Sequence, residues 1–415
     1  MTASVLGRDY RLLWSAAVSS RFGDALRTPA LALLAATLTR DPRAVAAVTV
    51  AAQLPPLLLG LLGGAYADRW DRRRTMAVVD GLRSALVAAL AGLVATGRAG
   101  VAALVVAAFL LAALGTVFDA ASFALLPSVV PPAALPTANG RLQAGTAVAG
   151  GFLGAPLAGV LFAISAALPF TLDAVTFAAA AVLVLALRRV PPSDEHRNRP
   201  APGRASVWRE AWAGMRWLRR DPVLWRVTVA TAGSNLAISG VMAVLVLYAL
   251  TVLRVPPAAY GLFAAGAVVG GLVGALGAGR LAARFGTLPA LRRVLLAQTL
   301  ALAGFAVARH PVPGGLALAC FAAGTTVWNS LWSAYGQRHV PAGLLGRVGA
   351  AQRTVGLVSA PVGAAVAGFA GQVYGVAPVG WAAAGVFALV TAGAWRTLRE
   401  GVSRAERRTE PVPRP

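Results

Sequence analysis

Long apolar stretches separated by short polar segments run through almost the whole chain. About 20 apolar residues cross the hydrocarbon core of a bilayer as a helix, whereas a lone strand would leave its backbone groups unpaired in lipid. The pattern therefore predicts an all-α membrane protein with twelve transmembrane helices. The predicted spans are residues 12–37, 44–66, 75–97, 101–127, 140–165, 168–187, 223–250, 259–282, 288–308, 314–336, 347–371 and 377–396.

The longest polar interruption lies between the sixth and seventh spans. It predicts a six-helix bundle over residues 1–188, a linker over 189–222, a second six-helix bundle over 223–398 and a basic tail over 399–415. Within the linker, apolar residues recur at helical spacing on one face and arginines on the other, at Trp208, Ala211, Trp212, Met215, Leu218, Arg209, Arg216, Arg219 and Arg220. This predicts an amphipathic helix, which either lies in the membrane interface or packs on loops of the protein itself.

Composition supports a membrane protein over a soluble one. The chain is 58% hydrophobic and 13% charged, with a mean hydropathy of +0.69, outside the range of soluble domains. A net charge of +23 would also suit a nucleic-acid partner, but the arginines gather in short loops between the spans. Such a bias marks the cytoplasmic side, so we expect the lipid bilayer, and no nucleic acid, as the partner. The loops predict a multi-pass protein of the cytoplasmic (inner) membrane, with both termini in the cytoplasm.

Several catalytic chemistries are excluded by residue type. The chain has no lysine, so it has no P-loop of its own and no Schiff-base catalyst. Its three histidines are scattered and do not match the spacing of metal ligands. The single cysteine, Cys320, is predicted to be a small packing residue within a span. We therefore expect no enzyme activity, no metal and no cofactor.

The most densely charged loop joins the second and third spans. Residues 64–74 read Gly-Ala-Tyr-Ala-Asp-Arg-Trp-Asp-Arg-Arg-Arg. This loop resembles the Gly-x-x-x-Asp-Arg-x-Gly-Arg-Arg signature of the major facilitator superfamily, although Asp71 stands where that family usually has glycine. The resemblance implies two six-helix bundles around one cavity and a gating role for the loop. The matching residues are Gly64, Asp68, Arg69, Arg72 and Arg73.

The two halves of the chain share this pattern. Residues 67–70 align with 282–285, and the same alignment pairs Gly64 with Gly279. A Gly-Arg pair precedes an Ala-Pro pair in both halves, at residues 140–141 and 155–156 and again at 346–347 and 360–361. The repeat predicts two bundles of parallel topology, as in major facilitator proteins. Ala283 replaces the acid in the second copy, so the charged loop is complete only in the first half.

Ionisable residues inside the spans are the first candidates for a transport site. Asp24 lies near the middle of the first span, with Arg21 and Arg27 three residues to either side on one helix face. Asp24 either binds a proton or transported cation, or belongs to a cluster that only holds helices together. An anionic substrate group bound by a spare arginine is a third reading. In the third span, Asp80 and Arg83 are spaced to pair at i, i+3.

The fourth and sixth spans each carry one acid. Asp119 lies in a stretch, 118–127, that resembles the macrolide-efflux and enterobactin-exporter-like branch of the superfamily, as do residues 138–140 and 217–222. In the wider superfamily an acid on the fourth helix pairs with an arginine of the charged loop, which implies that Asp119 pairs with Arg69 or Arg72. Direct contact of Asp119 with the substrate is the alternative. Asp173 is predicted to lie near the outer end of the sixth span, as an external latch or coupling residue.

The fifth span carries a Gly-Ala-Pro-Leu-Ala-Gly element at residues 154–159. It resembles the Gly-Pro-x-x-Gly element of drug/proton antiporters, although Ala155 separates its glycine from its proline. Small residues let helices approach closely and proline bends a span. Gly154, Pro156 and Gly159 are therefore predicted helix-bend and packing residues, while ordinary packing explains the element equally.

These observations predict a secondary active transporter that uses alternating access. We expect a monomer that exports an amphipathic small molecule, such as a drug or siderophore, by proton antiport. The alternative within transport is an importer or facilitator of a small polar solute. The alternative outside transport is a membrane sensor or assembly protein, against which the charges buried in the first half argue.

Overall fold

The computed structural model describes residues 7–67, 71–131, 134–188, 204–341 and 344–409, and the regular structure within them is entirely helical. The helices are α1 (Arg8–Leu38), α2 (Pro42–Ala67), α3 (Arg72–Ala95), α4 (Val101–Val129), α5 (Leu135–Ala147), η2 (Val148–Gly154), α6 (Ala155–Ile164), α7 (Leu168–Leu185), α9 (Arg204–Arg220), α10 (Pro222–Thr251), η3 (Pro257–Ala259), α11 (Tyr260–Phe285), α12 (Thr287–Val307), α13 (Pro311–His339), α14 (Leu345–Tyr374) and α15 (Val376–Thr409).

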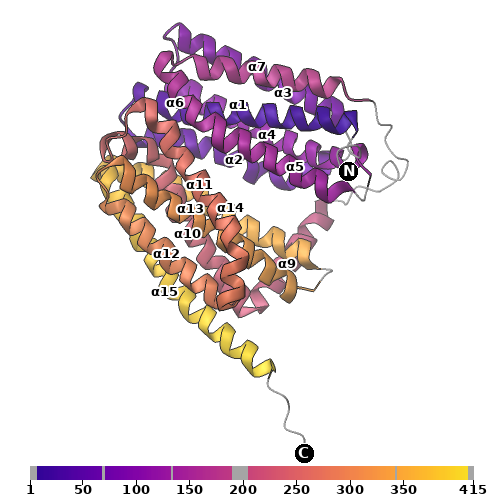
Figure 1. The fold of residues 1–415 in the computed structure, drawn as a ribbon, viewed down its shortest axis with the longest axis vertical. Helices are drawn as coiled ribbons and strands as arrows, with labels where there is room; N and C mark the ends of the chain where they lie inside the picture. The colour runs from indigo at the N-terminus through magenta and orange to yellow at the C-terminus, as the bar shows by residue number, and fades with distance from the viewer. Residues whose placement is uncertain (1–6, 68–70, 132–133, 189–203, 342–343, 410–415) are drawn as a thin grey trace, which may run out of the picture. The chain divides into compact units, whose positions relative to one another are not determined.

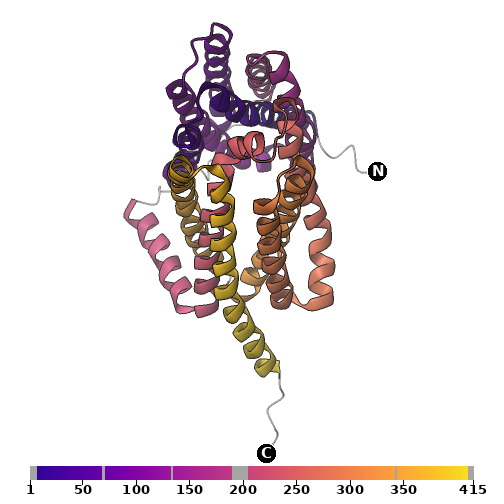
Figure 2. The ribbon, with the colours of Figure 1, turned by 90° about the vertical axis from the view of Figure 1, so that its left-hand side faces the viewer.

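The chain divides into two compact units, which are Met1–Pro202 with Val255–Ala265, and Gly203–Arg254 with Gly266–Pro415. In the first unit α1 packs on α7, α2 on α4, and α3 on both α4 and α7. These helices carry the indigo to magenta colours in Figure 1. In the second unit α10 packs on α14 and α15, and α12 packs on α13 and α15; Figure 2 shows them from a second direction.

Ten helical segments of the described residues are long and apolar enough to cross a membrane, and they correspond to the third to twelfth predicted spans. The first two predicted spans, α1 and α2, are helices of 31 and 26 residues but are not among the ten. In α1 the cause is clear, because Arg21, Asp24 and Arg27 interrupt its apolar run. Both helices pack against other helices of the first unit, so these charges do not have to face lipid.

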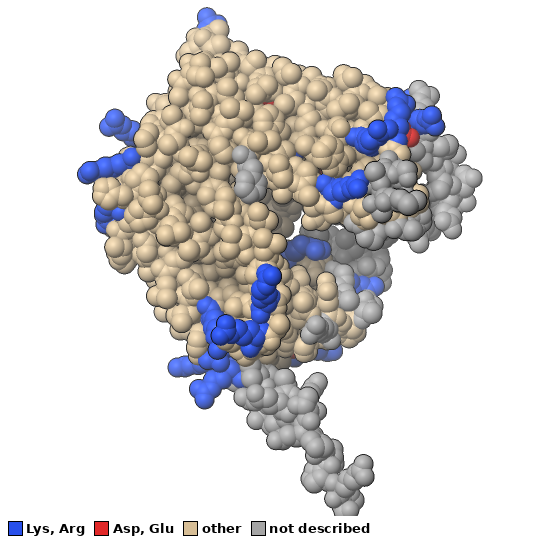
Figure 3. All heavy atoms as spheres, viewed as in Figure 1, with Lys and Arg blue, Asp and Glu red and all other residues tan. Residues whose placement is uncertain are grey.

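The outward surfaces of the helices are apolar. Leu276, Leu300 and Leu389 are 67%, 64% and 76% exposed, and in Figure 3 the blue arginines lie mainly at the margins of a broad uncharged surface. Soluble proteins rarely expose so many large apolar side chains together. A hydrocarbon environment removes that penalty, which agrees with a multi-pass membrane protein.

Short connections follow from local chemistry. Asp221 separates α9 from α10, and its Oδ1 accepts hydrogen bonds from the backbone N–H groups of Val223 and Leu224, both at 2.9 Å. This is an N-cap, since it satisfies donors that the first helical turn leaves open. Gly286 alone joins α11 to α12 with a φ of 79°, a conformation that glycine adopts without steric cost.

The fifth predicted span is one continuous helical segment with a wide turn in it. η2 is a π-helix that separates α5 from α6, and Pro156 follows in the first turn of α6. Because proline has no backbone N–H, the α-helical ladder loses a bond at this point. A Cβ on Gly154 would lie 2.5 Å from Cβ of Ala25 on α1, so α1 and this segment meet there without room for a side chain.

The amphipathic helix of the linker is α9, and it packs on α14 and α10. Met215 and Leu218 join a core cluster with Leu224 and Val348. A Cβ on Gly214 would lie 2.4 Å from the carbonyl oxygen of Arg347, so the two backbones are in close contact. These contacts favour the reading in which α9 packs on the protein itself. Residues 189–203 of the predicted linker lie outside the described residues.

Candidate functional site

The centre of the candidate site is Asp24, in the middle of α1. Its Oδ1 accepts hydrogen bonds from Nη2 of Arg83, at 2.7 Å, and from Nη2 of Arg27. Nη1 of Arg21 lies 3.9 Å from Oδ2 of the same carboxylate. The i, i+3 spacing predicted both contacts within α1, whereas the contact with Arg83 comes from α3 and has no signature in the local sequence.

Arg83 joins α1 to α3 and is only 3% exposed. Its Nη1 donates to Oδ1 of Asp80 at 3.3 Å, as the i, i+3 spacing predicted, and to Oγ of Ser20 at 3.1 Å. The guanidinium carbon also lies 4.0 Å from the ring centre of Phe177 on α7, close enough for a cation–π interaction. One side chain thus contacts residues of three helices.

Asp173 brings α7 into the same network. It is fully buried, and its Oδ2 accepts a hydrogen bond from Nε of Arg27 at 2.9 Å. Asp173 lies in the second turn of α7, and the structure joins it to Asp24 through a shared arginine. Its role as an external latch or coupling residue stays a prediction. We call Asp24, Asp80, Asp173, Arg27 and Arg83 the buried charge network.

The network holds more negative than positive groups. Three carboxylates face two guanidiniums when all five are ionised, and the Arg21–Asp119 pair at the edge of the network adds one charge of each sign. Among the described residues, Oδ2 of Asp80 and Oδ1 of Asp173 accept no hydrogen bond. An uncompensated charge is costly in a low-dielectric interior. The arrangement can therefore accept one more positive charge, either as a proton on a carboxylate or as a cation.

Asp119 contacts the edge of the network from α4. Its Oδ1 lies 3.4 Å from Nη2 of Arg21 on α1, and it is ten residues before the end of α4. Its pairing with Arg69 or Arg72 stays a prediction, because Arg69 lies outside the described residues. The Arg21–Asp119 pair is at the edge of the network, with side chains 48% and 65% exposed.

The predicted gating loop is only partly within the described residues. Asp68 and Arg69 lie outside them, Gly64 lies near the end of α2, and Arg72 begins α3. Arg73 donates from Nε to the carbonyl oxygen of Val184 at 3.2 Å, and from Nη2 to that of Leu185. These are the last carbonyl groups of α7, where a cation is favourable. Arg73 thus holds α3 against the end of α7.

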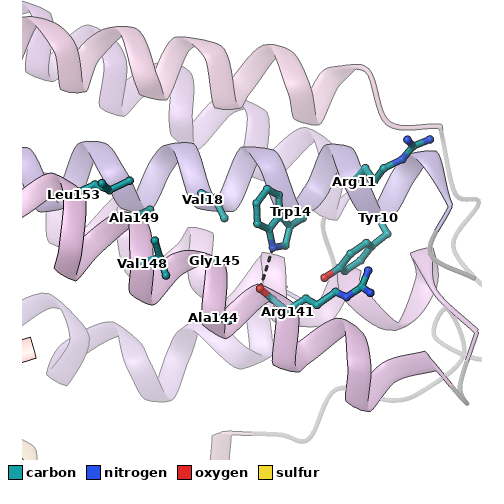
Figure 4. A pocket seen from close by; sticks show the side chains of 10 residues that line it. All are labelled: Tyr10, Arg11, Trp14, Val18, Arg141, Ala144, Gly145, Val148, Ala149 and Leu153. Atoms are coloured by element: carbon teal, nitrogen blue, oxygen red, sulfur yellow. Dashed lines mark hydrogen bonds between the residues drawn. The ribbon is translucent and has the colours of Figure 1, made fainter. Parts of the chain in front are cut away.

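A pocket of about 640 Å³ lies between α1 and the α5–η2 segment, and Figure 4 shows its lining. The α1 side consists of Tyr10, Arg11, Trp14 and Val18. Sequence reasoning missed this pocket, although a signal was present. Tyr10, Trp14, Val18 and Arg21 follow one another at helical spacing, which places them on one face of α1.

No metal site emerges from the described residues, since no three His, Cys, Asp or Glu side chains are grouped to hold an ion there. The acids of the buried charge network are instead paired with arginines. In the second unit, neutral hydrogen bonds link the helices. Nε2 of Gln298 donates to Oγ1 of Thr325 at 3.0 Å, and the hydroxyls of Thr299 and Thr391 lie 2.8 Å apart.

Gly23 gives a direct test of the packing around Asp173. A Cβ at this position would lie 2.2 Å from both Oδ1 of Asp173 and Oγ1 of Thr176, so Gly23→Ala requires these two side chains, or the helices that carry them, to shift. We expect it to lower the free energy of unfolding by about 1–3 kcal/mol, as overpacking does, measured by thermal unfolding of the purified protein. Gly81→Ala on α3, where a Cβ meets nothing within 4 Å, is the matched control. Equal stability of both variants would contradict the close approach of α1 and α7.

These features define a multi-pass helical membrane protein with a charged centre inside one bundle, which is typical of transporters. The chain belongs to the Major Facilitator Superfamily, whose family model matches residues 13–364. Members of that superfamily are secondary transporters and not enzymes.

Comparison with relatives and solved structures agrees with this assignment. The chain is 37% identical over 150 residues to an uncharacterized MFS-type transporter of Mycobacterium tuberculosis (strain ATCC 25618 / H37Rv) and to one of Mycobacterium bovis (strain ATCC BAA-935 / AF2122/97). Each match covers 35% of this chain and 34% of the relative, so the chain spans about a third of the length of the curated relatives it matches.

Three solved structures share the fold at low identity. The nucleoside transporter NupG has a TM-score of 0.72 at 15% identity, covering 94% of this chain and 99% of that one. A bacterial homologue of the iron transporter ferroportin in an inward-facing state has a TM-score of 0.73 at 17% identity, covering 94% and 98%. A bacterial homologue of the lysosomal transporter Spinster has a TM-score of 0.73 at 14% identity, covering 96% and 98%. At identities of 14–17% the similarity shows the fold and says nothing of the substrate.

Proposed function

We propose that this chain is a proton antiporter of the cytoplasmic membrane that exports an amphipathic small molecule from the cell. The observation that carries the proposal is the buried charge network, with its three carboxylates and two guanidiniums. Carriers that exchange a substrate for protons need a group that changes its protonation between two states. A network short of one positive charge provides such a group, because gaining a proton balances it.

Geometry divides the roles within the network. Asp24 is held by two arginines at one oxygen, so it anchors α1 to α3. Asp80 and Asp173 each have one arginine partner and one oxygen without a hydrogen bond in the described part of the chain. We assign the exchanged proton to this set of carboxylates. Asp24 remains part of the coupling site because its position decides how Arg27 and Arg83 are shared among the three acids.

The exporter branch of the superfamily is the favoured context. The stretches 118–127, 138–140 and 217–222, which resemble macrolide-efflux and enterobactin exporters, favour an amphipathic drug or siderophore as substrate. Gly154 and Gly159 belong to the element that resembles the one in drug/proton antiporters. A Cβ on Gly159 would lie 2.5 Å from the carbonyl oxygen of Ala258. Such close backbone contacts suit helices that slide on one another.

The decisive experiment is a transport panel in inverted membrane vesicles with an imposed proton gradient. The panel contains macrolides, catecholate siderophores and cationic dyes, with a nucleoside and a sugar as small polar solutes. Gradient-dependent accumulation of an amphipathic compound, abolished by a protonophore, supports the proposal. Accumulation of only the polar solutes, or transport that ignores the gradient, would replace it with an importer or a facilitator.

Topology gives a separate prediction. The arginine-rich segments are expected on the cytoplasmic side, so Arg197→Cys and Arg404→Cys should resist an impermeant thiol reagent in intact cells and react after permeabilisation. The background must carry Cys320→Ala, because Cys320, expected to pack between helices, is exposed. Arg98→Cys, in the loop between α3 and α4, is the control for the opposite side and should react in intact cells. A reversed pattern would invert the proposed orientation.

A further inference from the structure

We infer that the pocket between α1 and the α5–η2 segment binds an amphipathic anion, with its acidic group at Arg11 and Arg141 and its apolar part along η2. This inference rests on the proposed export function, since it names the class of molecule that the transporter accepts. The pocket has a volume of about 640 Å³, within the range of sites for small molecules.

The aromatic residues of the pocket present apolar faces. The hydroxyl of Tyr10 donates to the carbonyl oxygen of Ala138 at 2.9 Å, and Nε1 of Trp14 donates to that of Arg141 at 3.0 Å. Both polar atoms are therefore already satisfied by the protein. A Cβ on Gly145 would lie 2.7 Å from Cζ2 of Trp14, so the indole lies directly against the backbone of α5. These contacts fix both rings as apolar walls.

The polar groups left for a ligand are two guanidiniums at one end of the pocket; in Figure 4 the side chain of Arg141 lies beside Tyr10, whereas that of Arg11 extends away from Arg141, so Arg11 must turn to reach the same acidic group. Arg11 and Arg141 are exposed, and within the described residues neither forms an ion pair with an acidic side chain. Arg21 and Arg27, which sequence reasoning offered as anion binders, are instead paired with aspartates. A guanidinium binds carboxylate, phosphate or sulfonate groups through charge-assisted hydrogen bonds. Two positive charges without an acidic partner in the described part of the chain thus lie at the pocket.

The two kinds of lining are separated along the pocket. Figure 4 shows Arg11, Tyr10 and Arg141 at one end and Val148, Ala149 and Leu153 at the other. From Arg141 to Val148, where η2 begins, an α-helical rise of 1.5 Å per residue gives roughly 10 Å, and Leu153 lies a further turn along η2. The pocket therefore suits a molecule with an acid at one end and an apolar body.

The apolar end reaches the charged centre. A Cβ on Gly150 would lie 3.6 Å from Cγ of Arg21, the residue that pairs with Asp119 and Asp24. Gly150 directly follows Ala149 of the pocket lining, so the apolar end of the pocket lies close to the arginine at the edge of the buried charge network. This proximity gives a physical route by which a bound ligand and the proton-accepting acids affect each other.

Binding is tested at equilibrium and without any gradient, so that its failure is distinct from failure of proton-driven transport. The purified protein is placed in nanodiscs of zwitterionic lipid and titrated calorimetrically with decanoate, decanol and decylammonium. We expect saturable binding of decanoate and weaker binding of the other two. Equal binding of all three compounds would show partition into lipid and would overturn the inference, as would the absence of decanoate binding.

Matched variants locate the site. Arg11→Gln and Arg141→Gln should each raise the Kd of decanoate about tenfold or more, as expected for the loss of one charge-assisted hydrogen bond, whereas Arg98→Gln should not. Arg11→Lys should recover part of the affinity. Val148→Trp should block the apolar end, and Val160→Trp is its control, because the two valines lie in the same span and are 50% and 51% exposed.

Two further results would contradict the assignment. Unchanged decanoate affinity in both arginine variants would place any binding elsewhere. Displacement of decanoate by phosphatidylglycerol, added to the nanodiscs at a few mole per cent, would assign the pocket to an anionic lipid headgroup and not to a transported molecule. The inference requires that the lipid does not compete and that decanoate competes with the substrate found in the vesicle panel.

Discussion

Asp24→Asn is expected to reduce proton-driven accumulation in inverted vesicles by about tenfold or more, because each hydrogen bond to a charged group contributes about 1.5–3 kcal/mol. Asparagine preserves the size of the side chain but removes the charge that holds Arg27 and Arg83 together. The two arginines then repel each other and redistribute to Asp173 and Asp80. Any proton exchange that depends on the charge deficit of the network is lost.

A measurement of substrate binding by Asp24→Asn distinguishes a loss of proton coupling from a loss of the folded structure. Asp24→Asn should retain binding, or exchange of substrate down its own gradient, because Asp24 does not line the pocket between α1 and α5. Asp41→Asn is the matched control, since Asp41 pairs with Arg43 at 2.9 Å in the exposed loop before α2. The hydrogen bond from Arg43 lowers the pKa of Asp41, so this aspartate remains ionised near neutral pH and should not contribute to proton coupling.

Comparison with Asp80→Asn and Asp173→Asn locates the exchanged proton. A variant that transports at the wild-type maximum but no longer responds to pH identifies the carboxylate that carries the proton. If Asp24→Asn accumulates substrate with the wild-type rate and proton dependence, Asp24 is not part of the coupling site. Should binding disappear together with transport, the contacts of Asp24 are better described as a clasp that holds α1 and α3 together.

The sequence predicted the elements and the local pairs of this site, because both depend on short separations along a helix. Arg21 and Arg27 with Asp24, and Asp80 with Arg83, follow from i, i+3 spacing. Ten of the predicted spans are helices of sufficient length and hydropathy. The position of each charged residue within its predicted span also indicated its approximate depth in the bilayer.

Contacts between helices could not be predicted from the sequence. Helical periodicity tells which residues share one face of a helix, but not which other helix packs against that face. Arg83 with Asp24, Arg27 with Asp173, and Arg21 with Asp119 each join two helices. The family resemblance placed Asp119 against the charged loop and gave no sign of its contact with Arg21. The pocket depends on three features: the π-helix η2, the missing side chain at Gly145 and the two exposed arginines. Helical periodicity does not show that these features lie together.

The largest loss of stability is expected from Arg83→Met. Methionine fills a similar volume but cannot pair with Asp24 and Asp80, which contact Arg83 at 2.7 and 3.3 Å. Breaking a buried ion pair by removal of one partner costs about 3–5 kcal/mol, since the other charge is left in a low-dielectric interior. The measurement is the free energy of unfolding of the purified protein, with Arg98→Met as the control for loss of an exposed arginine.

A second substitution distinguishes the charge of Arg83 from its packing on Phe177. In Arg83→Met/Asp80→Asn one of the two stranded acids is also neutralised, so the double variant should regain part of the lost stability. The double-mutant cycle then yields a favourable coupling energy between Arg83 and Asp80. If the double variant is as unstable as the sum of the single variants predicts, Arg83 acts mainly by filling space against Phe177. In that case the charge deficit assigned to the network does not describe its energetics.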